Sequence, residues 1–189
     1  AISDDVKPVA NSNLFRLAMQ YADHFGLFIM SHSEDKNLVG DGVMNEGFVS
    51  TKLGLPGTTR AAEEVMIARD ILVAEAEGKR IHLCHVSTRG GVQLVREAKA
   101  RGVRVTAETT PHYIGATDEW VIGYDSRCRV NPPLREEADR QACIDGLCDG
   151  TIDVIATDHA PHHEDEKSCE FHIAARGISG LEIAFRIRN

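Results

Sequence analysis

Hydrophobic and polar positions change period along the chain, which predicts helices and strands in alternation. Apolar side chains recur every three to four residues over 11–25, from Thr58 or Thr59 to Gly78, over 91–101 and over 136–148, which predicts four helices. Each helix ends near a glycine and leads into a short apolar or β-branched run, which predicts strands over 27–30, 81–84, 103–107 and 152–156. This order indicates parallel βα units, in an open doubly wound sheet or in a closed barrel.

Two of the predicted helices present an apolar face that we expect to pack on the sheet. The residues on these faces are Leu14, Leu17, Ala18 and Tyr21 in the first helix, and Ala61, Val65, Ala68 and Leu72 in the second. Glu63 and Glu64 lie in the first turn of the second helix, where the helix dipole favours negative charge.

Polar residues of metal-binding types follow every predicted strand, in the segments 31–35 (SHSED), 84–87 (CHVS), 108–112 (ETTPH) and 157–159 (TDH). The carboxyl ends of parallel strands share one face of a sheet, so these side chains are expected to meet there. Neutral imidazole and carboxylate are the ligands of a catalytic zinc, which makes His32, His85 and Asp158 the candidate set. We assign His24 and His82 structural or surface roles.

The composition of the 189 residues narrows the classes of function. A count of 21 Lys and Arg against 29 Asp and Glu gives a net charge of -8, which argues against electrostatic binding to nucleic acid or anionic lipid. No apolar run approaches the roughly 20 residues that span a bilayer, and no secretory leader is recognisable. The five cysteines form no Cys-x-x-Cys pair, which predicts reduced thiols in a cytoplasmic protein.

Six ordered motifs resemble those of the dihydroorotases of the amidohydrolase superfamily, over about residues 3–182. They are HSED (32–35), MNEG (44–47), HVST (85–88), TAETTPH (106–112), NPPLR (131–135) and IATDHAPH (155–162). The resemblance implies an α/β fold, a (β/α)8 barrel of the metal-dependent hydrolase kind, of which residues 1–189 would form the second half, strands 5 to 8. The strands carrying the family's His-x-His-x-Arg motif, and a C-terminal closing segment, would lie outside this partial catalytic domain. We therefore expect the 189 residues alone to be inactive and prone to aggregation.

The resemblance also implies individual roles. One or two zinc ions would be held by Asp5, His32, His85 and Asp158. Asp5 aligns with the carboxylate that bridges two metals in the bacterial branch of the family that lacks a carboxylated lysine, and Asp158 would also transfer the proton. The glycine that follows this carboxylate in the family is Val6 here. The residues implied to contact substrate are Asn131, His162, Arg176 and Gly177.

The implied activity is the reversible cyclisation of N-carbamoyl-L-aspartate to L-dihydroorotate in pyrimidine biosynthesis. Allantoinases, hydantoinases and dihydropyrimidinases remain as alternatives, because they share the barrel and the His, His, Asp ligand pattern. A noncatalytic dihydroorotase-like partner subunit is the other alternative. The expected partners are a small-molecule substrate and either a second copy or another pyrimidine-pathway enzyme. We expect 163–167 to be a solvated loop and 37–57 to be a loop across the mouth of the site.

Overall fold

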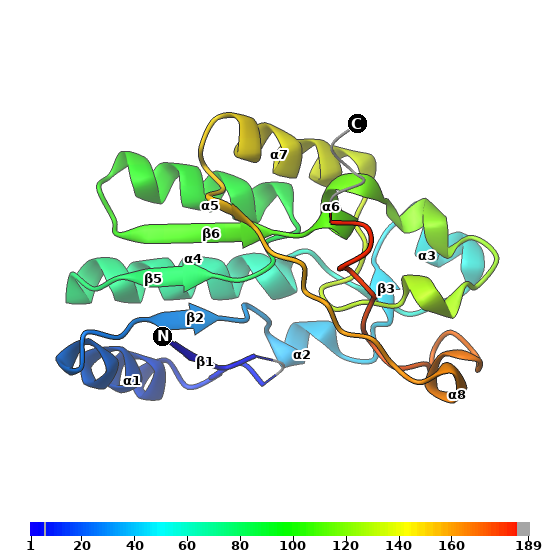
Figure 1. The fold of residues 1–189 in the computed structure, drawn as a ribbon, viewed down its shortest axis with the longest axis horizontal. Helices are drawn as coiled ribbons and strands as arrows, with labels where there is room; N and C mark the ends of the chain where they lie inside the picture. The colour runs from blue at the N-terminus through cyan, green and yellow to red at the C-terminus, as the bar shows by residue number, and fades with distance from the viewer. Residues whose placement is uncertain (6, 185–189) are drawn as a thin grey trace.

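A computed structural model describes residues 1–5 and 7–184, and its centre is a parallel five-stranded sheet (Figure 1). The strands are β1 (Ile2–Ser3), β2 (Ile29–Ser31), β5 (Ile81–Leu83), β6 (Val105–Thr109) and β7 (Val154–Ile155), in that spatial order. Each pairs in parallel with the next, with Ile29 opposite Ile81 and Ile81 opposite Val105. The four predicted strands are therefore present, and β1 is an additional strand that the polar start of the chain did not suggest.

Four helices connect consecutive strands and cover one face of the sheet: α1 (Ser12–His24), α4 (Ala61–Glu77), α5 (Arg89–Ala100) and α7 (Glu137–Cys148). The side chain of Asn11 accepts a hydrogen bond from Leu14 N at 2.9 Å and begins α1, and Thr88 begins α5 in the same way through Gly91 N. Gly78 ends α4 in the left-handed conformation, at φ 61°. The connections turn the chain back so that every strand runs in the same direction.

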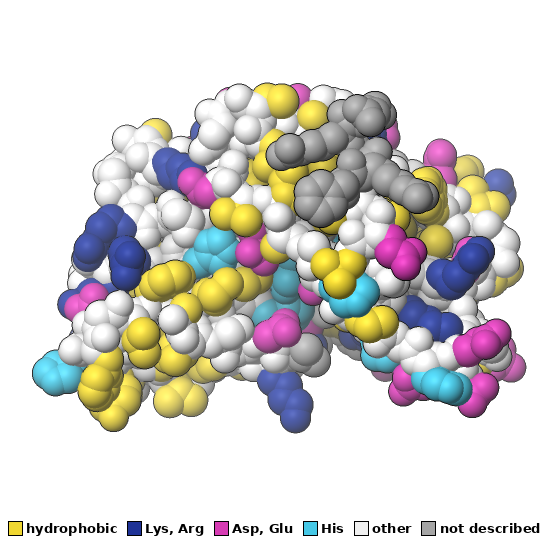
Figure 2. Space-filling view, in the orientation of Figure 1, with side chains coloured by type: hydrophobic (Ala, Val, Ile, Leu, Met, Phe, Trp, Pro, Cys, Tyr) yellow, Lys and Arg dark blue, Asp and Glu magenta, His cyan; other side chains and the backbone are white. Residues whose placement is uncertain are grey.

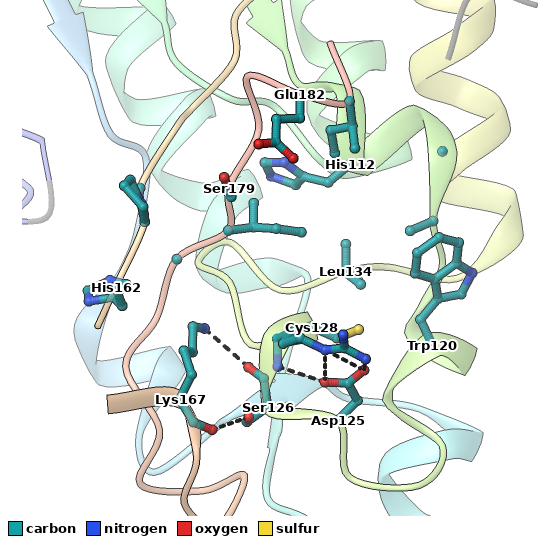
Figure 3. Close-up of a pocket in the computed structure, with 18 of the residues that line it drawn as sticks. His112, Trp120, Asp125, Ser126, Cys128, Leu134, His162, Lys167, Ser179 and Glu182 are labelled. Carbon is teal, nitrogen blue, oxygen red and sulfur yellow. Dashed lines mark hydrogen bonds and ion pairs between the residues drawn. The ribbon is translucent and has the colours of Figure 1, made fainter. Parts of the chain in front are cut away.

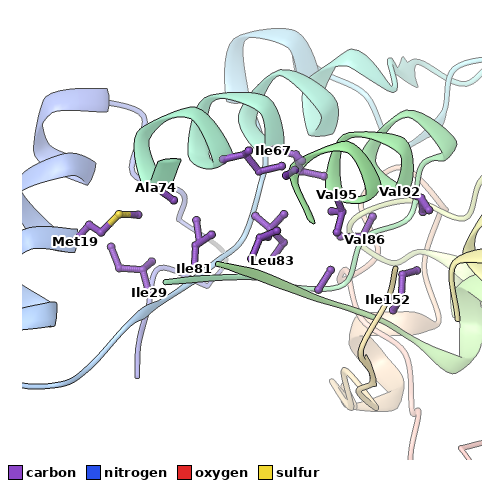
Figure 4. Packing of buried hydrophobic residues seen from close by; sticks show 14 of the residues in the cluster. Met19, Ile29, Ile67, Ala74, Ile81, Leu83, Val86, Val92, Val95 and Ile152 are labelled. Carbon is purple, nitrogen blue, oxygen red and sulfur yellow. The ribbon is translucent and has the colours of Figure 1, made fainter. Parts of the chain in front are cut away.

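The main hydrophobic core lies between this sheet and these helices (Figure 4). Leu83 and Val95 are fully buried in it, and Ile67 is 1% exposed. The cluster contains Phe15, Met19, Ile29, Ile67, Ile71, Ala74, Ile81, Leu83, Val86, Val92, Val95, Ala98, Val105, Ala107, Cys143 and Ile152. The outer layer of the fold is thus packed by residues of this chain alone.

Both predicted helix faces were wrong. In α1 the buried residues are Phe15, Met19 and Ala22, whereas Leu14, Leu17 and Tyr21 are exposed. In α4 the buried residues include Met66, Ile67 and Ile71, and Val65 and Leu72 are exposed. Each helix has two apolar rows at helical spacing, so periodicity identifies the helix but does not decide which row faces the sheet.

A smaller lobe lies beyond the carboxyl ends of the strands, at the right of Figure 1. Its elements are α2 (Lys36–Val39), β3 (Met44–Asn45), α3 (Phe48–Leu53), β4 (Gly57–Thr58), α6 (Pro111–Gly115), the 3-10 helices η1 (Asp118–Val121) and η2 (Ser126–Cys128), and α8 (Glu164–Lys167). Residues 37–57 are therefore not a plain loop, because β3 and β4 form a parallel pair over a core of Met44, Val49, Val121 and Phe171. Residues 163–166 are exposed, as expected for a solvated segment, but 164–167 form a short helix rather than a loop.

The other face of the sheet is open. On this face Val154 is 45% exposed and Thr106 is exposed. Ile2 and Ile155, in the two edge strands, are 41% and 38% exposed although they share the side of the helices. Figure 2 shows hydrophobic and histidine side chains reaching the surface over the strands. Within residues 1–5 and 7–184, β1 pairs only with β2 and β7 only with β6, which leaves both edges of the sheet free.

Two predictions from composition can be compared with the fold. All five cysteines are free thiols, as expected. In the part of the chain that the structure describes, no helix combines the length and the apolar character that crossing a bilayer requires.

Candidate metal centre

Two histidines meet where two neighbouring strands end. His32 directly follows β2 and His85 lies just past β5, and their Nδ1 and Nε2 atoms, respectively, are 2.8 Å apart. Both side chains are buried, with relative exposures of 2% and 4%. Asp5 lies past β1, with its Oδ1 4.0 Å from His32 Nδ1. The structure thus brings together three of the four predicted ligands, one from each of three adjacent strands.

The donor atoms in this cluster fit a metal ion. Each of Asp5, His32 and His85 offers one ligand atom, and these atoms lie within 4.8 Å of one another. His85 Nδ1 is buried and has no hydrogen-bond partner. Burial, with His32 beside it, lowers the pKa of His85, which favours the neutral imidazole that binds metal. Two imidazoles and a carboxylate form the kind of set that leaves a position open for water.

Asp158, the fourth predicted ligand, approaches from β7 but lies outside this group of three. Its Oδ2 lies 4.0 Å from Nε2 of His112. Burial raises the pKa of Asp158, while the nearby His85 lowers it. Both Asp158 and His85 have positive φ angles, 44° and 38°, in a region that residues other than glycine rarely adopt. Such backbone conformations concentrate at functional sites.

Sequence reasoning missed two side chains beside the cluster. Asp4 Oδ1 accepts a hydrogen bond from His32 N at 2.9 Å and so links the end of β1 to the first ligand. His112 is 2% exposed, and neither of its ring nitrogens has a hydrogen-bond partner. Burial, with a smaller contribution from His85, lowers the pKa of His112 to about 3, so the ring is neutral. The acidic pair 4–5 and the histidine within TAETTPH were the available signals.

Asn131, which the resemblance implies to contact substrate, lies next to the histidine cluster. Its Nδ2 is 3.4 Å from His32 Nε2. The segment that follows is anchored by Tyr113, whose hydroxyl donates to the carbonyl of Pro132 at 2.6 Å. The amide of Asn131 is therefore held beside the candidate ligands.

His162, Arg176 and Gly177 form a second group. His162 Nε2 is 3.0 Å from the carbonyl oxygen of Arg176, and Gly177 N donates to the carbonyl of Arg129 at 2.9 Å. A Cβ on Gly177 would lie 2.5 Å from the carbonyl oxygen of Ala160, so only glycine fits at this point. The predicted substrate loop thus packs directly against the predicted substrate histidine.

Three successive carbonyls hold the substrate loop in place. The carbonyl of Ala174 accepts a hydrogen bond from Arg129 Nη1, and that of Ala175 accepts one from Lys167 Nζ at 2.7 Å. The carbonyl of Arg176 pairs with His162 Nε2, as described above. Lys167 also donates to the carbonyls of Ser126 and Arg129, at 3.1 and 3.0 Å. These contacts tie the loop to the segment around η2 and give it a defined backbone.

A cavity of about 1110 Å³ lies beside this loop (Figure 3). Its wall includes His112, Leu134, His162 and Gly177, but not His32 or His85. It therefore adjoins the histidine cluster through His112 rather than containing it.

His82 has a structural role, as its surroundings indicate. Its Nδ1 and Nε2 are 2.8 Å from Thr106 Oγ1 and 3.0 Å from Glu108 Oε2, so both ring nitrogens are hydrogen-bonded. Cys84 lies close enough to complete a possible ligand group with His82 and Glu108. Burial and the neighbouring carboxylates strongly raise the pKa of Cys84, which opposes the thiolate form that binds metal. Val6, where the family has glycine, lies outside the described residues.

Comparison with known proteins decides the family. A family model described as Dihydro-orotase-like matches residues 1–91. The dihydroorotase of Pelotomaculum thermopropionicum is 60% identical over 184 residues, which are 97% of this chain and 43% of that protein. The chain belongs to the dihydroorotase family. Another member, the dihydroorotase of Citrifermentans bemidjiense, is 56% identical over 99% of this chain and 44% of its own length. The chain thus spans less than half of these curated relatives.

Solved structures agree on the fold of this dihydroorotase-family chain. The L-hydantoinase (dihydropyrimidinase) from Arthrobacter aurescens superposes with a TM-score of 0.81 at 22% identity, over 99% of this chain and 43% of that one. The D-hydantoinase from Thermus sp. gives 0.78 at 21% identity, over 93% and 40%. At these identities the likeness concerns the fold alone. It confirms the predicted fold, part of a (β/α) barrel.

Proposed function

We propose that the protein carrying this chain is a zinc-dependent dihydroorotase that interconverts N-carbamoyl-L-aspartate and L-dihydroorotate. The observation that carries the proposal is the meeting of Asp5, His32 and His85 at the carboxyl ends of three adjacent strands, in a chain of this family. We propose Asp158 as the fourth ligand. A site of this kind needs no nucleic acid or membrane partner, and we place the protein in the cytoplasm.

The residues would divide the chemistry between them. When bound, zinc supplies Lewis acidity that activates water and polarises the amide carbonyl. In ring opening, the oxygen of water forms a bond to the carbonyl carbon and its proton passes to Asp158. Asp158 then returns the proton to the ring nitrogen as the carbon–nitrogen bond breaks. The raised pKa of Asp158, a consequence of burial, favours a carboxyl group that both accepts and returns a proton.

Two groups beside the cluster would orient the substrate. The Asn131 amide lies next to His32, and we propose that it hydrogen-bonds the pyrimidine ring. His162 and the backbone of Arg176 and Gly177 form one continuous wall, which we propose receives the other side of the substrate. This arrangement would hold the reacting amide beside Asp158.

We also propose that residues 1–189 form the second half of a barrel and act only together with a first half. The open face of the sheet and its two free edges support this proposal, as does the 43% share of the Pelotomaculum relative that the chain spans. The first half would contribute the His-x-His-x-Arg motif of the family. Residues 1–189 expressed alone are expected to show no turnover of carbamoyl aspartate with added zinc, and a rate equal to that of the full-length protein would contradict this.

The experiment that tests the activity compares full-length protein with its Asp158→Asn variant. The unaltered protein is expected to bind at least one equivalent of zinc and to turn over carbamoyl aspartate and dihydroorotate in preference to hydantoin, dihydrouracil and allantoin. Asp158→Asn keeps the shape of the side chain and one oxygen ligand but cannot accept the proton. It is expected to abolish turnover while retaining most of the zinc.

Three results would count against the proposal. Preference for another cyclic amide would move the protein to a related amidohydrolase activity. Less than one equivalent of metal in the full-length protein would support a noncatalytic subunit. Retained turnover in Asp158→Asn would remove Asp158 from the proton transfer.

A further inference from the structure

A second buried polar cluster lies beneath the ligand loops and touches none of the candidate ligands. Its centre is the ion pair between Glu63, in the first turn of α4, and Arg135, the last residue of the NPPLR motif, with 3.3 Å between Oε2 and Nη2. Both side chains are 3% exposed. A buried ion pair brings little net stability compared with apolar packing of the same volume, so its presence calls for another role.

Glu63 holds the backbone that immediately follows His85. Its carboxylate accepts hydrogen bonds from Ser87 N at 2.9 Å and from Thr88 N at 3.1 Å, and also from both hydroxyl groups. Two backbone amides and two hydroxyls therefore bind one carboxylate, two residues past a ligand whose own φ is 38°. A backbone conformation of that kind persists only when its surroundings fix it.

Arg135 connects the same carboxylate to the other side of the site. Its guanidinium donates to Ser87 Oγ at 3.1 Å, to Asn45 Oδ1 at 3.2 Å and to the carbonyl of Thr58 at 3.5 Å. The chain leading to Arg135 begins at Asn131, whose amide lies beside His32. One side chain thus joins the His85 loop, the β3–β4 lobe and the segment that carries the proposed substrate amide.

We propose that the buried pair Glu63–Arg135 is a positioning device that fixes the His85 loop relative to the Asn131 segment. The inference rests on the proposed function, because it treats His85 as a zinc ligand and Asn131 as a substrate contact. It explains why three of the motifs, MNEG, HVST and NPPLR, contain polar residues that meet each other instead of the ligand cluster. Glu63 and Arg135 are positioning residues, because each acts through the backbone of another segment.

The test compares three variants of the full-length protein. Glu63→Gln keeps the size of the side chain but removes the charge and one acceptor oxygen, and it is expected to weaken zinc affinity by about 10- to 100-fold. Arg135→Lys keeps the charge but cannot bridge several segments, and it is expected to raise KM more than it lowers zinc affinity. Glu75→Gln is the matched control, because Glu75 lies on the same helix in an exposed pair with Arg101, and it is expected to change neither.

Zinc affinity is measured on metal-free protein by competition with a chromogenic chelator, beside kcat and KM for carbamoyl aspartate and thermal unfolding of each variant. If the single variants do not fold, the same measurements are made on the double variant Glu63→Gln with Arg135→Met. This variant removes both buried charges together, so neither is left without a partner. We expect this variant to fold and still to bind zinc weakly. A folded single or double variant with zinc affinity and KM within twofold of the unaltered protein would overturn the inference.

The two proposals fail in different ways. If the unaltered protein binds zinc but turns over neither substrate, the proposed function is wrong, and the zinc affinities still decide the role of Glu63. If the unaltered protein is active and Glu63→Gln and Arg135→Lys lose only thermal stability, the pair is structural and the positioning role is wrong.

Discussion

Residues with a left-handed backbone conformation lie at both ends of the parallel sheet, but they have different roles at the two ends. At the end where the strands begin, left-handed residues are glycines that follow helices: Gly26, Gly78, Gly102 and Gly150. A Cβ at any of these four positions would meet nothing within 4 Å. At the end where the strands finish, the left-handed residues include His85 and Asp158. At the starting end, glycines adopt the left-handed conformation in turns, whereas at the finishing end two candidate metal ligands, His85 and Asp158, adopt it.

Charge is arranged differently at the two ends as well. Ion pairs at the starting end are solvent-exposed links between neighbouring elements, namely Arg16–Glu77, Lys79–Asp23, Arg101–Glu75, Arg96–Asp149 and Lys99–Asp153. At the finishing end, Glu63 and Arg135 are almost completely buried, and so is Asp70. The starting end can therefore change with little effect, whereas a change at the finishing end leaves buried charge without a partner. Barrel enzymes show this division between a stability face and an active face.

The largest expected difference between the ends is the cost of losing an arginine. Arg135→Ala leaves the Glu63 carboxylate buried without its cation and is expected to lower the free energy of unfolding by about 3–5 kcal/mol. Arg101→Ala removes a surface pair at the other end and is expected to leave the urea midpoint unchanged. Urea denaturation of the full-length protein measures both. An equal loss of unfolding free energy in Arg135→Ala and Arg101→Ala would show that the two ends of the sheet do not differ in this respect.

A smaller difference concerns pH. Burial raises the pKa of Asp70 to about 6 from its ordinary value of 3.8, despite hydrogen bonds from Ser31 and Arg69. The folded state thus binds this proton more tightly, so stability is lost as pH rises from about 4 to about 6. Asp70→Asn is expected to abolish that loss, which amounts to about 3 kcal/mol at about 1.4 kcal/mol per pKa unit.

The measurement is the free energy of unfolding against pH for the unaltered protein and the Asp70→Asn variant. The matched control is Asp145→Asn, which changes an exposed carboxylate in α7 and is expected to leave the slope unchanged. Parallel curves for the unaltered protein and Asp70→Asn would show that burial does not govern this carboxyl group.

The smallest expected effect is at a glycine turn. Gly102 has φ 83°, so Gly102→Ala is expected to cost about 1–2 kcal/mol while leaving kcat unchanged. Gly102→Asn should cost less, because asparagine tolerates the left-handed region better. Thermal unfolding and steady-state kinetics test both variants. A loss of kcat in Gly102→Ala would show that the two ends of the sheet are not independent.

Much of this architecture is predictable from local pattern. Helix periodicity with glycine stops locates α1, α4, α5 and α7, and the polar residues after each strand place His32, His85 and Asp158 at one end of the sheet. The buried side of α1 is not predictable, because Leu14, Leu17 and Tyr21 form as regular a row as Phe15, Met19 and Ala22. Which row is buried depends on neighbours far away in sequence.

The ion pair at the centre of the second cluster shows another limit of sequence reasoning. Glu63 in the first turn of a helix is explained by the helix dipole, and nothing local links it to Arg135. Their pairing depends on the long connection through the β3–β4 lobe, and it becomes visible only when four separate segments are placed in space. The sequence predicts which residues of ligand type follow each strand. It does not predict the long-range contacts that hold these residues in position, which require the structure.

The location of the main core has a practical consequence for protein engineering. The apolar cluster between the sheet and its helices is filled by residues of this chain, while β1 and β7 each have one free edge within residues 1–5 and 7–184. If the protein is the two-part barrel that we propose, a cut just ahead of β1 should give two separately translated pieces, of which residues 1–189 have their own packed outer layer. Co-expression of the two pieces would then restore activity by complementation. The pair would serve as a split reporter whose enzymatic signal depends on the pairing of the free edges of the sheet.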